Sequence, residues 1–151
     1  MPYLTQEEIE LIKECIERFL EVQGFIAKDG ALWRILKFEA QKDGAYFELE
    51  YIIELSDQGR KIIKMGEEVK VHDGLVEIDI ETDIELIECK SGIWEIKNAQ
   101  IIKNLQDKLL SAKEYGKQLQ KSFVVVTKKQ IPPMWQNWLD QNNINHRDWE
   151  P

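Results

Sequence analysis

The stretch EIDIETDIELIECKSG, residues 77–92, reads as two buried strands joined by a short turn. Apolar residues alternate with polar ones along it, which is the period of a β-strand. Four charged residues nevertheless lie inside these strands: Glu77, Asp79, Glu88 and Lys90. Burying a charge costs free energy unless the charge is paired, so this charged hairpin needs a physical explanation.

Pairing of the two strands predicts where the charges lie. With a turn at residues 82–83, Glu77 would lie opposite Glu88, and paired residues share a face of the sheet. One face would then carry all four charges together with Leu86. The other face would carry the apolar side chains that bury the hairpin: Val76, Ile78, Ile80, Ile87 and Cys89. The charged face is either the solvated side of an antiparallel hairpin or a built site.

A divalent cation would explain the clustered carboxylates, because carboxylates held together repel one another unless a cation is present. Mg²⁺ prefers oxygen ligands and commonly takes one or two carboxylates, with water and substrate phosphate completing its shell. Asp79, Glu88 and the backbone carbonyl of Cys89 could supply the protein ligands. Lys90 would then point at the same phosphate. These are the parts that metal-assisted phosphodiester hydrolysis needs.

The sequence GLVEIDI (74–80) followed by IELIECKSG (84–92) resembles the core motif of the PD-(D/E)XK nuclease superfamily. The resemblance makes Asp79 the first acid, and Glu88 and Lys90 the E-x-K element. It implies a restriction-endonuclease-like fold and a Mg²⁺- or Mn²⁺-dependent endonuclease that cuts DNA, with RNA as a further substrate. The motif's Pro before the first acid is replaced by Ile78, and the Gln-x-x-x-Tyr pattern of the exonuclease-like branch is absent.

The resemblance also implies further site residues. Many members carry an acid on the first helix, and Glu14 follows the family's order; Glu77 is either another metal ligand or a partner of Lys90. Nucleic acid would be steered by lysines of the second half of the chain: Lys97, Lys103, Lys128 and Lys129. Residues 91–151 carry a charge of +3 within a chain of net charge −8, which permits a local basic surface. The same lysines could equally be a solvated helix and loop face.

The remaining periodicities predict a single α/β domain over residues 1–151, with a mixed central β-sheet flanked by helices. Thr5 and Glu8 form a capping box for a first helix ending at Gly24. Residues 31–38, 45–55 and 60–65 are rich in aromatic and β-branched residues, which predicts an elaborated antiparallel meander. A helix over about 98–120, a parallel strand over 123–127 and a short helix after Pro132-Pro133 follow.

Composition excludes several classes of protein. No segment is long and apolar enough to cross a membrane, and the N-terminus lacks the pattern of a signal peptide, so we expect a cytoplasmic protein. Two cysteines and two histidines make neither a disulfide framework nor a zinc site. The partners implied are nucleic acid and a second copy in a homodimer.

A second hypothesis comes from a different class. Residues 1–90 carry a charge of −11, which suits a non-catalytic, nuclease-fold binding module or subunit that recognises a basic protein. The intact Asp79, Glu88 and Lys90 set argues against it, because a module without catalysis has no physical reason to keep repelling carboxylates together.

Overall fold

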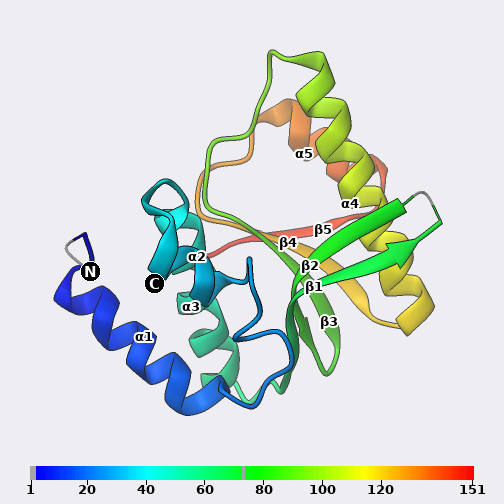
Figure 1. The fold of residues 1–151 in the computed structure, drawn as a ribbon. Coiled ribbons are helices and arrows are strands. Elements are labelled where there is room, and N and C mark those ends of the chain that lie inside the picture. Colours follow the sequence, from blue (N-terminus) through cyan, green and yellow to red (C-terminus); the bar gives the residue numbers. More distant parts are fainter. Residues whose placement is uncertain (1–2, 73) are drawn as a thin grey trace. The chain divides into compact units, whose positions relative to one another are not determined.

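A computed structural model describes residues 3–72 and 74–151 as an α/β protein with a five-stranded mixed sheet flanked by helices (Figure 1). The sheet has the strand order β1-β2-β3-β4-β5. The elements are α1 (Gln6–Phe19), α2 (Ala31–Lys37), η1 (Glu39–Gln41), α3 (Lys42–Asp57), β1 (Ile62–Val71), β2 (Gly74–Thr82), β3 (Glu85–Lys90), α4 (Ala99–Leu119), β4 (Ser122–Thr127), α5 (Pro133–Gln141) and β5 (Asn145–Asp148).

The chain divides into two compact units. The first comprises the described residues up to Glu67, together with Asp79–Asp83 and Pro151. The second comprises Glu68–Ile78 and Ile84–Glu150, of which Asp73 lies outside the described residues. None of the described helices is both long and apolar enough to cross a membrane.

Helix α1 begins as the sequence predicts. The Thr5 side chain accepts a hydrogen bond from the Glu8 backbone N–H, and the Glu8 carboxylate accepts one from the Thr5 N–H. The helix ends at Phe19, five residues before the predicted stop at Gly24. The rings of Phe19 and Phe25 are both buried with centroids 6.3 Å apart, so the chain turns back early to bring them together.

Gly24 has a different role from the predicted helix stop. Its φ is +87°, and a Cβ there would lie 1.8 Å from the Met65 carbonyl oxygen. The neighbouring Gln23 carbonyl accepts a hydrogen bond from the Met65 N–H, at 2.9 Å. Only glycine fits, because the backbone here runs directly against β1.

The predicted meander is wrong in its first two strands. Residues 31–38 and 45–55 form helices α2 and α3, and only residues 60–65 contribute to a strand, β1. The buried side chains of α3 form two rows at helical spacing, which are Ala45, Leu49, Ile52 and Phe47, Tyr51, Leu55. Two buried rows cover most of the helix and leave only a narrow polar stripe that includes Glu50 and Glu54, so the helical period is weak. The β-branched and aromatic content then mimics a strand.

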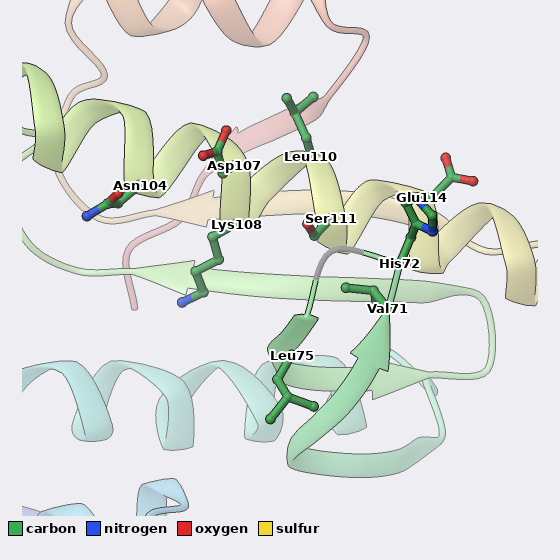
Figure 2. A pocket seen from close by; sticks show the side chains of 9 residues that line it. All are labelled: Val71, His72, Leu75, Asn104, Asp107, Lys108, Leu110, Ser111 and Glu114. Carbon is green, nitrogen blue, oxygen red and sulfur yellow. The ribbon is translucent and has the colours of Figure 1, made fainter.

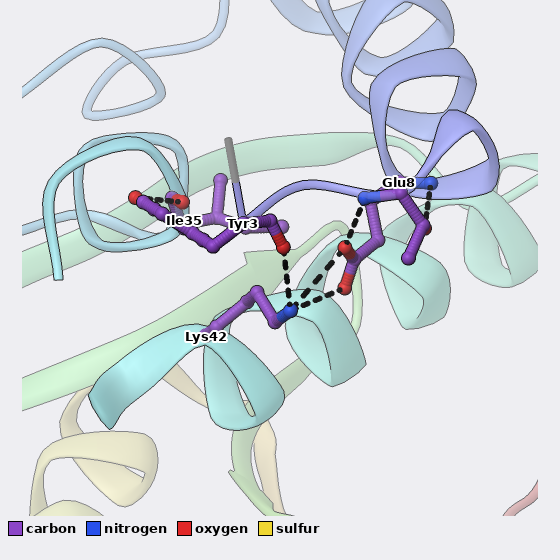
Figure 3. A network of polar contacts seen from close by, with 5 residues as sticks. Tyr3, Glu8, Ile35 and Lys42 are labelled. Carbon is purple, nitrogen blue, oxygen red and sulfur yellow. Dashed lines mark hydrogen bonds and ion pairs between the residues drawn. The ribbon is translucent and has the colours of Figure 1, made fainter. Parts of the chain in front are cut away.

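The N-terminus of the first unit is tied to α2 and α3 by a polar network (Figure 3). The Tyr3 hydroxyl donates to the Ile35 carbonyl at 3.1 Å, and the Lys42 ammonium donates to the Tyr3 carbonyl at the same distance. Lys42 also lies 3.4 Å from the Glu8 carboxylate. The Lys42 contacts join α1 and α3. Desolvation raises the pKa of the Glu8 carboxyl, but its hydrogen bonds with Thr5 and the nearby Lys42 ammonium outweigh this and lower the pKa below its ordinary value.

The predicted hairpin exists, with one correction. Strand β2 runs through Thr82 and β3 starts at Glu85, so the turn falls on residues 83–84, one position later than predicted. Leu86 is fully buried and belongs to the same core cluster as Val76, Ile78 and the α4 residues Leu109 and Ala112.

The second unit follows the prediction closely. Strand β4 pairs parallel with β3 after the crossover helix α4, and α5 starts with Pro133 in its first turn. One core cluster joins the strands to both helices through Leu86, Phe123, Leu109 and Trp135. Strand β5, which pairs parallel with β4, was not predicted from the sequence.

The buried interior of α3 generates the first testable prediction. Ile52 is fully buried, so Ile52→Ala should lower the free energy of unfolding by about 2–5 kcal/mol through lost burial and a residual cavity. Ile26 is 66 % exposed, so the matched change Ile26→Ala should cost no more than about 0.5 kcal/mol. Urea unfolding followed by circular dichroism measures both. Equal costs would contradict the buried position of this helix face.

The buried thiol in α1 generates the second prediction. Burial raises the pKa of Cys15 to about 12, and its Sγ lies 3.7 Å from the Leu49 carbonyl. The folded state therefore keeps a proton that the unfolded state loses near pH 9, so stability should fall as the pH rises from about 9 towards 12. Urea unfolding at pH 8 and pH 10.5 should show this fall, and Cys15→Ala should remove that part of it. An unchanged pH dependence in Cys15→Ala would contradict the prediction.

Candidate functional site

The E-x-K element lies at the carboxyl end of β3, within the second unit. Glu88 pairs with Val125, Cys89 with Val126 and Lys90 with Thr127 of the parallel strand β4. The Lys90 carbonyl accepts a hydrogen bond from the Lys128 N–H, 3.1 Å away. Sheets of this kind bind ligands at the carboxyl ends of their parallel strands, which is where this element stands.

Glu88 is nearly buried and faces helix α4. Alternation along β3 puts its side chain on the same face as Leu86, which packs against α4. The Lys108 ammonium lies 3.0 Å from the Glu88 carboxylate, and the Glu88 side chain is 12 % exposed. Lys108 was not among the residues singled out from the sequence. The sequence could have indicated it, because Lys108 lies one helical turn before the core residue Ala112 and therefore on the same face of the helix.

Lys90 is half-buried beside these two groups. Burial lowers the pKa of its ammonium, the Glu88 carboxylate raises it and the Lys108 ammonium lowers it again. The Lys90 Nζ also lies 5.2 Å from the centroid of the Trp94 ring, a cation–π contact. The site therefore holds two ammonium groups and one carboxylate at the edge of a dry core.

Trp94 belongs to that core. It is 2 % exposed, and its ring lies 4.9 Å from the ring of Trp135. A base cannot stack on a ring that is enclosed in this way, so Trp94 is a core residue. Its indole N–H is one of the buried groups without a hydrogen-bond partner among the described residues.

The other residues predicted as metal ligands lie on β2 and α1. Asp79 is buried in β2 within the first unit, and Glu77 is half-buried in the part of β2 that belongs to the second unit. Glu14 lies on α1, where its carboxylate pairs with Arg18 at 2.8 Å. Within residues 3–72 and 74–151, no three His, Cys, Asp or Glu side chains are grouped closely enough to hold a metal ion.

The predicted nucleic-acid-binding lysines are exposed but differ in their surroundings. Lys103 pairs with Asp107 on α4 at 3.2 Å. The backbone N–H of Lys97 donates to the Glu95 carboxylate in the loop before α4. Lys128 and Lys129 follow β4 directly, and Lys128 lines a pocket while Lys129 does not. The described structure therefore distributes these lysines over α4 and two loops.

A pocket of about 520 Å³ lies along α4 in the second unit (Figure 2). Its polar lining comes mainly from α4, with His72 from the connection after β1: His72, Asn104, Asp107, Lys108, Ser111 and Glu114. Figure 2 shows the Lys108 side chain extending from the helix towards the strand below it. Neither Glu88 nor Lys90 lines this pocket, so it adjoins the E-x-K element only through Lys108.

Comparisons with known proteins identify no relative. No protein-family model matches the chain, and neither a curated protein nor a solved structure matches it. The resemblance to the PD-(D/E)XK superfamily therefore rests on the residues and the order of elements alone.

The pair formed by Glu88 and Lys108 generates the third prediction. Lys108→Ala should destabilise the protein by about 1–3 kcal/mol, because it takes a cation from a carboxylate that is largely removed from water. Lys103→Ala removes the same charge from the same helix but breaks only an exposed pair, which should cost under about 0.5 kcal/mol. Chemical denaturation of both variants checks this. If both variants lose the same unfolding free energy, the pair of Lys108 with Glu88 stabilises the protein no more than an exposed pair, which contradicts the prediction.

Proposed function

We propose that this protein is a divalent-metal-dependent nuclease that hydrolyses phosphodiester bonds in DNA, with RNA as a further substrate. The observation that supports this best is the placement of Glu88 and Lys90 at the carboxyl end of β3, followed by α4 and a parallel β4. An isolated E-x-K sequence has little meaning, and its position at this edge of the sheet is what favours a site.

The order of elements supports a restriction-endonuclease-like arrangement. Helix α1 precedes three consecutive strands, β1, β2 and β3, which are neighbours in the sheet. Short connections of this kind join antiparallel strands. Helix α4 then leads to β4, which is parallel to β3. Helices α2 and α3 are additions between α1 and β1, where the sequence predicted extra strands.

The proposed metal ligands are Asp79, Glu88 and the Cys89 backbone carbonyl. Their oxygen atoms suit Mg²⁺ or Mn²⁺, and a cation that keeps water and substrate phosphate needs only one or two carboxylates. The lack of a three-residue group among the described side chains is therefore compatible with such a site. When bound, the metal would activate a water molecule and offset charge on the phosphate.

Lys90 is the second part of the proposed chemistry. Its ammonium, half-buried beside Glu88, would orient the attacking water or offset the negative charge that grows on the phosphate oxygens. Such an interaction is stronger in a site with little water than at an open surface. Lys108 would hold the Glu88 carboxylate in place when no metal is bound.

The non-catalytic binding module stays as a second candidate because of the same Lys108 contact. An ammonium 3.0 Å from Glu88 already compensates the buried carboxylate, so no metal is needed to stabilise the fold. This candidate predicts no metal binding and a basic protein partner for the acidic half of the chain.

Cleavage assays separate the two candidates and form the fourth prediction. Supercoiled plasmid, single-stranded DNA and RNA should be cut with Mg²⁺ or Mn²⁺ but not with EDTA. Lys90→Ala should lower the rate by at least about 100-fold, because it removes a cation aimed at developing charge. Lys117→Ala, which removes an exposed charge of α4, should leave the rate within about twofold.

A thermal-shift measurement completes this test. Mn²⁺ should raise the melting temperature of the wild type, because a ligand that binds the folded state stabilises it. Asp79→Ala should abolish that rise. If none of the three substrates is cut and no metal-dependent thermal shift is seen, the nuclease is excluded and the binding module is left as the candidate function.

A further inference from the structure

A second pocket lies at the carboxyl ends of β4 and β5, within the second unit. It has a volume of about 460 Å³, within the range of about 300–1,000 Å³ that small-molecule sites occupy. Two short segments line it, one after β4 and one at the end of β5: Lys128, Gln130, Asp148, Trp149 and Glu150. Nothing in the proposed hydrolysis uses these side chains apart from general steering by Lys128.

Strand register places this pocket beside the E-x-K element. Lys90 of β3 pairs with Thr127 of β4, and Thr127 pairs with Asp148 of β5. The three residues form one row across parallel strands, which are about 5 Å apart. Lys128 and Trp149 each come one residue further along. Suppose that a nucleic acid has one phosphate at Lys90 and runs across the ends of β3, β4 and β5. Its next nucleotides would then lie over this pocket.

Backbone hydrogen bonds hold the two segments in place. The Lys128 N–H donates to the Lys90 carbonyl at 3.1 Å, and the Trp149 N–H donates to the Thr127 carbonyl at 2.9 Å. The Thr127 hydroxyl is fully buried and donates to the Asp148 carboxylate at 2.9 Å. Neither of the two backbone bonds uses the Lys128 or Trp149 side chain, so alanine or phenylalanine substitutions there leave their donors and acceptors in place.

The lining combines the groups that recognise a nucleotide. Trp149 is half-buried and offers an indole ring, and Lys128 is an exposed cation. Base stacking on aromatic rings with lysine contacts to phosphate is the usual mode of binding single strands. The carboxylates of Asp148 and Glu150 repel phosphate but accept hydrogen bonds from amino groups of a base or from ribose hydroxyls. The phosphate therefore belongs at Lys128, and the base and sugar at the other side of the pocket.

We propose that this pocket binds one unpaired nucleotide of the substrate strand next to the cleaved bond, with its base stacked on Trp149 and its phosphate paired with Lys128. This inference rests on the proposed nuclease function, since it assigns a subsite to the same substrate. The substrate would then be single-stranded at the site of cleavage, because a base that stacks on a protein ring is no longer stacked and paired in a duplex.

Binding of a fluorescein-labelled single-stranded oligodeoxyadenylate of about 12 nucleotides tests the proposal, since single-strand sites cover about 4–16 nucleotides. Fluorescence anisotropy in EDTA at low salt measures affinity without cleavage. Trp149→Ala should weaken binding by about 5- to 100-fold, as expected for the loss of one stacked base, while Trp149→Phe should keep most of the affinity. Lys128→Ala should weaken binding several-fold and reduce its salt dependence by about one phosphate contact.

Lys117→Ala is the matched control, because it removes the same charge from an exposed position on α4 that does not line the pocket. It should change affinity by less than about twofold. The proposal is overturned if the wild type does not bind the oligonucleotide, if Trp149→Ala binds as the wild type does, or if Lys128→Ala and Lys117→Ala weaken binding equally. The Lys128 comparison holds even where Trp149→Ala fails to fold, because Lys128 is exposed.

A parallel cleavage assay keeps this outcome apart from the fate of the proposed nuclease. Selective loss of binding in Trp149→Ala without any metal-dependent cleavage would leave the nucleotide pocket standing and reject the nuclease. Metal-dependent cleavage by the wild type, with unchanged binding and cleavage rate in Trp149→Ala and Lys128→Ala, would support the nuclease and reject the nucleotide pocket.

Discussion

The parallel pairing of β4 with β3 is the constraint on which the second unit depends. Six consecutive residue pairs join the two strands, from Glu85 with Ser122 to Lys90 with Thr127. A parallel partner cannot be reached by a tight turn, so the chain needs the long crossover helix α4. Strand β4 is then enclosed between β3 and β5, and Val124, Val125 and Val126 are buried. A strand with such an apolar centre is typical of this enclosed position in a sheet.

The same pairing gathers the chemically useful groups. Parallel strands end at one edge of the sheet, so the ends of β3, β4 and β5 bring Lys90, Lys128 and Trp149 into neighbouring positions. Helix α4 crosses back from this edge and adds Lys108 to Glu88. A nearly buried carboxylate would be costly alone, and the surrounding ammonium groups reduce this cost. The proposed hydrolysis and the proposed nucleotide pocket both follow from this single edge.

Prediction succeeded where the periodic signal was strong and failed where packing hid it. Helix α4 has one apolar stripe and a polar remainder, and β4 is a short run of valines, so both were found within a residue or two. Helix α3 is buried on two rows of side chains, so its strand-like composition was misleading. Strand β5 has the sequence NHRD, which carries no apolar signal, and it exists because β4 offers an unpaired edge.

The sequence by itself determined the capping box of α1, the crossover from β3 to β4 and the location of Glu88 and Lys90 on one strand, because these depend on local spacing and hydrophobic periodicity. Tertiary structure alone decided that Lys108 contacts Glu88, that Trp94 is enclosed beside Trp135, and that the chain's last strand forms a pocket with Lys128. These contacts join residues 20 or more positions apart. Their geometry follows from how helices pack on a sheet, which no short stretch of sequence encodes.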